Sequence, residues 1–221
     1  MKTIMKKTTI IAFVLGLFLV SCGSNAVETG EAQEVTENNS AEAVDYSTLG
    51  EGSHVQWRAA HLGGIVKRYG KVSLVSANVK TLENKVTNAS ITIDLGSLTV
   101  ENFEEGDESK GKLEGHLKSA DFFDVENNPT AAFELTGIEA GTGDYNSMVT
   151  GNLTIMDSTK SITFGANITV TDESVTVKSE DFTVNREDWG LTHNKEGTAN
   201  VPAEYLISSD LGFTIDATIN K

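Results

Sequence analysis

The residues of this sequence best suited to chemistry are its four histidines, His54, His61, His116 and His193. An imidazole can ligate a metal ion, transfer a proton or bind a polar headgroup. Metal-binding histidines of one element recur with H-x-H spacing on a strand or i, i+4 spacing on a helix, and no pair here has either spacing. We therefore expect no metal site. His61 is in phase with an apolar strand face, so it is either a hydrogen-bonded core residue or a polar contact for a ligand.

Motifs for nucleophilic catalysis are absent from the sequence. There is no Gly-x-Ser-x-Gly turn, no Gly-rich loop leading to a Lys, and no His near the single Cys, Cys22. The acidic run over residues 104–108 lacks the alternating ligands and central Gly of a calcium loop, so we interpret it as a solvated loop. These observations predict a protein that is not an enzyme and carries no cofactor.

The elements that must position these residues are β-strands, because apolar and polar residues alternate along most of the chain from Tyr46 onward. This period is clear over residues 55–61, 89–95, 162–170 and 211–219. Further strand candidates are residues 72–81, 131–138, 148–156 and 174–182. About eight antiparallel strands with one apolar face each must close or stack to hide that face and their edges. We expect an all-β fold, an antiparallel eight-stranded barrel.

One segment of the chain breaks this period. Leu113, His116 and Leu117 have helical spacing, which predicts a short amphipathic helix near residues 108–119 that covers the mouth or flank of the barrel. Several inward positions carry alanine, at residues 59, 89, 166 and 217. Small inward residues favour a ligand cavity in a barrel of this size, although a packed core is equally compatible with the composition.

The N-terminus has the features of a bacterial lipoprotein signal. Three Lys precede an apolar run over residues 10–20, which is too short to span a bilayer. The run ends in Leu-Val-Ser-Cys at residues 19–22, which is similar to the lipobox, where the Cys is acylated and becomes the mature N-terminus. We expect a signal peptide over 1–21, a lipidated Cys22, and a protein anchored at the cell envelope on its periplasmic or outer-membrane face.

Charge and composition restrict the remaining possibilities. Residues 22–45 carry several acidic residues, no Lys or Arg and few large apolar residues, so they predict a flexible acidic tether before a single domain over 46–221. A formal net charge of −15 argues against a nucleic-acid partner. One Cys excludes a disulfide framework within the chain. The sequence is compatible with a monomer or a homodimer.

A continuous block of residues gives the chain a family resemblance. Residues 116–124 read His-Leu-Lys-Ser-Ala-Asp-Phe-Phe-Asp and are followed by Asn-Pro-Thr-Ala-Ala-Phe at 128–133, which resembles the signature of the YceI-like family. Four further blocks agree in order, over residues 55–63, 93–98, 151–164 and 185–191. The departures are Asn128 for Tyr, Asp157-Ser158 for a Gly-centred turn, and Trp189 for Phe. An inward Trp189 would shrink or reshape a pocket.

This resemblance implies a lipocalin-like barrel with an elongated apolar cavity that binds an isoprenoid or another long-chain lipid without covalent chemistry. The expected ligand-binding residues are Trp57, His61, Phe103, Leu113, Phe122, Phe133, Phe164, Phe182 and Trp189. In the family motif, Arg186 is expected to be either a buried structural partner for a carboxylate such as Asp121 or a clamp for a ligand headgroup.

Two other functions are compatible with the sequence. A solid barrel would make the protein a structural or interaction lipoprotein that presents a surface patch. An inward His61 paired with a carboxylate in a cleft would favour an enzyme that acts on a lipid, although the missing nucleophile motifs disfavour this reaction class.

Overall fold

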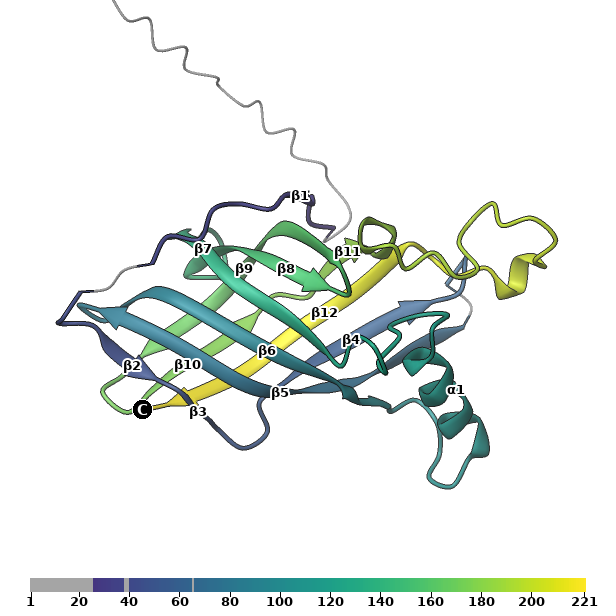
Figure 1. Cartoon of the computed structure of the whole chain (residues 1–221), viewed down its shortest axis with the longest axis horizontal. Helices are drawn as coiled ribbons and strands as arrows, with labels where there is room; N and C mark the ends of the chain where they lie inside the picture. The colour runs from purple at the N-terminus through teal and green to yellow at the C-terminus, as the bar shows by residue number, and fades with distance from the viewer. Residues whose placement is uncertain (1–25, 38–39, 65) are drawn as a thin grey trace, which may run out of the picture.

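The computed structural model describes residues 26–37, 40–64 and 66–221, and its main feature is a closed antiparallel barrel (Figure 1). The barrel strands are β4 (His54–Ala60), β5 (Lys67–Leu82), β6 (Lys85–Val100), β7 (Thr130–Ala140), β8 (Ser147–Ile155), β9 (Ser158–Val170), β10 (Ser174–Ser179) and β12 (Asp210–Asn220). Each pairs with the next, and β12 pairs back onto β4 to close the barrel. The expected all-β, eight-stranded barrel is confirmed.

Local turn chemistry explains how the longest hairpin forms. β5 and β6 have 16 residues each and are joined by only two residues, Glu83 and Asn84. Both have positive φ, at 51° and 59°. Such backbone angles match a two-residue hairpin turn to the right-handed twist of its strands, and Asn tolerates them better than most residues.

The barrel wall has a seam where one strand is interrupted. β10 ends at Ser179, and β11 (Phe182–Asn185) continues the pairing with β12 after a break at residues 180–181. β10 pairs with β9 only as far as Ala166. The next amide, that of Gly165, donates to the Glu180 carboxylate at 2.6 Å instead. The first half of β9 therefore has an edge that neither β10 nor β11 covers.

An N-terminal segment covers this edge. β1 (Gly30–Glu31) pairs with β9, and the Val27 amide donates to the Thr183 carbonyl on β11 at 2.8 Å. We call residues 26–37 the strap. Over residues 26–37 the structure thus differs from the flexible tether expected over 22–45, because the strap finds backbone partners on an open strand edge. The expected signal peptide and Cys22 lie outside the described residues.

Two short strands extend the barrel at the end where β5 and β12 finish. β2 (Val44–Tyr46) pairs with β5, and β3 (Thr48–Leu49) pairs with the end of β12. The Tyr46 hydroxyl donates to the Thr171 carbonyl at 2.7 Å, and its ring is buried in the core. Tyr46, where strand-like alternation starts in the sequence, is therefore part of the core.

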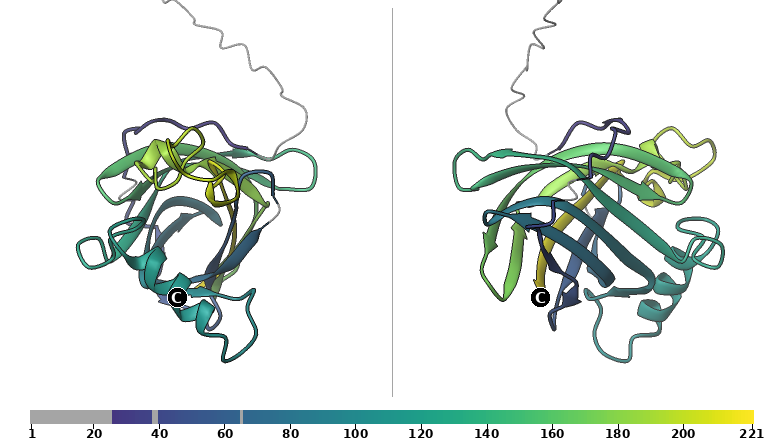
Figure 2. Two further views of the ribbon diagram at one scale, coloured as in Figure 1. Left: turned by 90° about the vertical axis from the view of Figure 1, so that its right-hand side faces the viewer. Right: turned by 60° about the vertical axis from the view of Figure 1, so that its left-hand side comes forward.

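The helices gather at one end of the barrel, which we call the mouth. α1 (Glu108–Lys118) begins after Asp107, whose side chain accepts a hydrogen bond from the Ser109 amide and so lowers the pKa of this carboxyl. η1 (Arg186–Trp189) leads into the mouth loop, residues 190–209, which contains η2 (Ala203–Tyr205). Figure 2 shows α1 and the mouth loop around this end. The helix expected near 108–119 is confirmed, and no described helix is long and apolar enough to cross a membrane.

Candidate ligand cavity

The barrel encloses an elongated cavity of about 200 Å³. Its walls run from Val79 and Ile219, beside β2 and β3, to Leu117, Phe122 and Ile207 at the mouth. All other lining residues among those described are also apolar, except for Arg186. A cavity of this composition offers water few hydrogen bonds, so it suits an apolar chain better than solvent.

A row of aromatic rings crosses the cavity wall. The rings of Phe133 and Phe164 lie 5.9 Å apart, those of Phe164 and Phe182 are stacked at 4.6 Å, and Phe182 lies 5.8 Å from Phe213. The row therefore connects β7, β9, β11 and β12. Gly151 on β8 makes room for it, because a Cβ at this position would lie 2.2 Å from Cζ of Phe133. Stacked and tilted rings give this wall a fixed shape.

Five of the expected ligand-binding residues line the cavity: Trp57, Phe122, Phe133, Phe164 and Phe182. Trp57 presents no free polar group to it, because its Nε1 donates to the Thr99 carbonyl at 3.1 Å. Phe213, Phe123 and Leu211 also line the cavity and were not among the expected residues. The alternation over residues 211–219 contained the signal for Phe213 and Leu211.

The other four expected residues lie outside the cavity lining. Strand β4 ends at Ala60, so His61 no longer follows its alternation; its Nδ1 contacts the backbone oxygen of Glu204 at 2.5 Å. The Arg68 guanidinium lies over the ring of Phe103, with its Cζ 4.8 Å from the ring centroid. Leu113 lies on α1 and packs against the core. Trp189 is buried among core residues, where its Nε1 donates to the Leu153 carbonyl.

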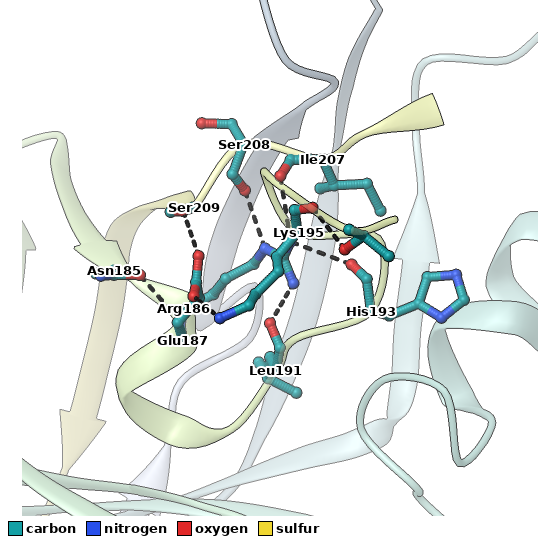
Figure 3. Close-up of polar contacts among 10 residues, drawn as sticks. Asn185, Arg186, Glu187, Leu191, His193, Lys195, Ile207, Ser208 and Ser209 are labelled. Carbon is teal, nitrogen blue, oxygen red and sulfur yellow. Dashed lines mark hydrogen bonds and ion pairs between the residues drawn. The ribbon is translucent and has the colours of Figure 1, made fainter. Parts of the chain in front are cut away.

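Arg186 holds the mouth loop in place at the end of the cavity (Figure 3). Its Nε donates to the Ser208 carbonyl at 2.9 Å, and Nη2 donates to the carbonyls of His193 and Ile207 at 3.1 and 3.2 Å. Nη1 donates to the carbonyl of Leu191. The side chain is 4% exposed, and its burial lowers the pKa of the guanidinium.

This network corrects the expected pairing of Arg186 with a carboxylate such as Asp121. Backbone carbonyls of a tightly turning loop satisfy four donor positions of the planar guanidinium fork. Asp121 instead contacts His116, whose Nε2 lies 3.0 Å from its Oδ2. The neighbouring Glu187 accepts from Ser209 Oγ at 2.6 Å and from Lys195 Nζ at 2.9 Å, and these bonds lower the pKa of its carboxyl.

A polar cluster lies beside the mouth. His116, Asp121 and His193 each place one possible ligand atom within 4.8 Å of the other two. The two imidazole rings meet edge to face, with centroids 5.0 Å apart. The spacing of the histidines in the sequence gives no sign of this cluster, because the two histidines belong to segments far apart in the sequence that only the fold brings together.

Comparisons with known proteins agree with this architecture. A model of the YceI-like domain matches residues 46–219. The UPF0312 protein of Pseudomonas putida strain F1 is 32% identical over 165 residues, which cover 73% of each chain. A UPF0312 protein of Pseudomonas aeruginosa is 30% identical over 166 residues, covering 74% of each chain. The chain belongs to the YceI-like family.

Two solved structures share the YceI-like barrel. BcnA of Burkholderia cenocepacia has a TM-score of 0.55 at 19% identity, with 75% of this chain and 95% of that chain covered. A polyisoprenoid binding domain from Saccharophagus degradans, implicated in plant cell wall breakdown, has a TM-score of 0.57 at 14% identity, with coverages of 79% and 98%. At these identities the likeness establishes the fold.

Proposed function

We propose that this YceI-like protein binds one long-chain lipid in its barrel cavity and acts as a carrier or buffer without catalysis. The observation that carries the proposal is the cavity wall, which is apolar from Val79 and Ile219 to the mouth apart from Arg186. Removing an apolar chain from water contributes about 25 cal/mol per Å² of buried apolar surface, so the barrel needs no covalent step to retain it.

An isoprenoid is the lipid class that we favour. The neighbouring barrel from Saccharophagus degradans is a polyisoprenoid binding domain, and the two chains share their barrel fold. A long branched hydrocarbon also suits an elongated apolar cavity whose wall carries a row of aromatic rings. This choice rests on fold likeness and cavity chemistry together.

The alternatives considered from the sequence have less support. A solid barrel is at odds with the cavity of about 200 Å³. A lipid-converting enzyme built on His61 is disfavoured, because the Nδ1 of that residue contacts a backbone oxygen and its ring does not line the cavity. A non-catalytic binding role therefore accounts best for the observed interior.

Mass spectrometry of an organic extract tests the binding proposal. The mature chain with Cys22→Ser is purified from a bacterial host without detergent, extracted and analysed for lipids. We expect a stoichiometric long-chain lipid, with an isoprenoid as the predominant species. A protein that is empty and also fails to take up added polyprenols would contradict the proposal.

We further propose that lipidated Cys22 anchors the protein at the bacterial cell envelope. The support is the positive and apolar N-terminal sequence that ends in Leu-Val-Ser-Cys at residues 19–22. Metabolic labelling with a fatty-acid analogue should mark the wild-type chain and should not mark the Cys22→Ser variant. Equal labelling of both chains would contradict the anchor.

A further inference from the structure

We propose that His116, Asp121 and His193 bind one divalent transition-metal ion, with Zn²⁺ as the representative, beside the mouth of the barrel. The three residues come from the last turn of α1, the loop that follows it, and the mouth loop. This binding site is separate from the lipid cavity, and it does not depend on the proposed lipid-binding function.

The geometry of the three side chains already approaches a coordination site. Their possible ligand atoms lie within 4.8 Å of one another, and His116 Nε2 is 3.0 Å from Asp121 Oδ2. Tetrahedral zinc with bonds of about 2.0–2.1 Å places neighbouring ligand atoms about 3.3 Å apart. Small rotations of partly exposed side chains are enough to close the largest gap, because Asp121 and His116 are 58% and 42% exposed.

The backbone around these residues is firmly held. The Asp121 amide donates to Ser119 Oγ at 3.3 Å, and the Ser119 hydroxyl donates to the His116 carbonyl at 2.8 Å. On the other side, Arg186 Nη2 donates to the backbone oxygen of His193, while the imidazole of His193 points away from the guanidinium (Figure 3). The ligand-bearing segments are thus fixed before an ion arrives, which reduces the entropy cost of binding.

Phe122 connects the cluster to the cavity. Its ring lies 5.1 Å from that of His116 and 5.0 Å from that of His193, and it also lines the cavity. The aromatic ring restricts the orientations of both imidazoles and provides an apolar shell on one side of the site. An ion held here would lie next to the mouth, separated from the cavity by this ring.

The ligand chemistry identifies the class of metal. Two imidazoles and one carboxylate suit zinc and other divalent first-row ions better than calcium or magnesium, which prefer oxygen ligands alone. Three protein ligands leave one position of a tetrahedral ion open for water or for an oxygen of another molecule. The exposed faces of His116 and Asp121 provide a path by which the ion reaches the site.

Calorimetric titration with zinc sulfate tests the site. The protein is used without a histidine tag, after treatment with a chelator and dialysis. We expect one Zn²⁺ per chain, and at least about tenfold weaker binding for His193→Ala and for Asp121→Asn. The matched control is His54→Ala, which removes an imidazole at the opposite end of the barrel and should leave the affinity unchanged.

Cobalt substitution adds a readout that a purely structural role would not change. Co²⁺ bound by the wild-type chain should give the visible absorption of a tetrahedral site, and His193→Ala should lose it. This variant keeps the backbone oxygen that Arg186 contacts, so circular dichroism should confirm its fold. Wild-type protein without stoichiometric Zn²⁺ binding, or a folded His193→Ala variant with wild-type affinity, would overturn the proposal.

Discussion

Trp189 Nε1 donates a hydrogen bond to the backbone oxygen of Leu153 at a distance of 2.9 Å. The bond ties the turn that follows β11 to β8, two strands that are not paired in the sheet. Trp189 is 2% exposed and packs in the main core cluster. The indole therefore stabilises the interior near the seam, and it does not itself line the cavity.

Trp189→Phe should lower stability without changing lipid binding. The substitution removes the donor to Leu153 and leaves a small void, which together cost roughly 1–3 kcal/mol of the free energy of unfolding. Urea unfolding of the two chains measures this difference. Lipid bound per chain should stay the same, because Trp189 does not line the cavity. Loss of lipid from a folded variant would place the indole in the binding site.

Filling the cavity should displace the lipid. Ala89 lines the cavity on β6, whereas the next residue, Ser90, is exposed on the outer face. Ala89→Trp places an indole in the space that we assign to the chain, at a packing cost of up to about 1–3 kcal/mol. We expect little or no lipid in an extract of this variant and wild-type amounts in Ser90→Trp. Equal lipid content in the two folded variants would disprove binding at this level of the barrel.

Removing one side chain should loosen the strap. Asn152 Nδ2 donates to the Gln33 carbonyl at 2.7 Å, and its Oδ1 accepts from the Gln33 amide at 2.9 Å. Asn152→Ala removes both bonds and should speed hydrogen exchange and glutamate-specific cleavage within residues 26–37. The control is Thr150→Ala on the same strand, since Thr150 contacts Thr163 instead of the strap. A strap that is equally protected in both variants would show that other contacts hold it.

Glu187 should contribute to the loss of stability in acid. Its bonds to Ser209 and Lys195 hold the pKa of the folded carboxyl below its ordinary value of 4.5. Its contribution is therefore present above that value and is lost as the pH falls through the lower pKa of the folded state. Unfolding midpoints of Glu187→Gln should fall less steeply below this pH than those of the wild type. The control is Glu126→Gln, which changes an exposed side chain and should leave the pH dependence of the unfolding midpoint as in the wild type.

The sequence by itself determined the strands, the short helix and the family. The alternation over residues 162–170 specifies a strand with one apolar face, because successive side chains of a strand point to opposite sides. Five aromatic residues of the cavity wall, among them Phe164 and Phe182, followed from the same rule and from the family blocks. These are local properties, since the backbone period and a short motif need no information from distant residues.

Only the tertiary structure decided the partners of Arg186, the position of His61, the docking of the strap and the cluster of His116 and His193. His61 lies just beyond the end of β4, where the alternation rule no longer applies. The strap has few large apolar residues, yet an open edge of β9 supplies its hydrogen bonds. Each of these features depends on backbone groups or side chains that are distant in the sequence. Their positions are fixed only when the barrel closes and the mouth loop folds around the buried guanidinium.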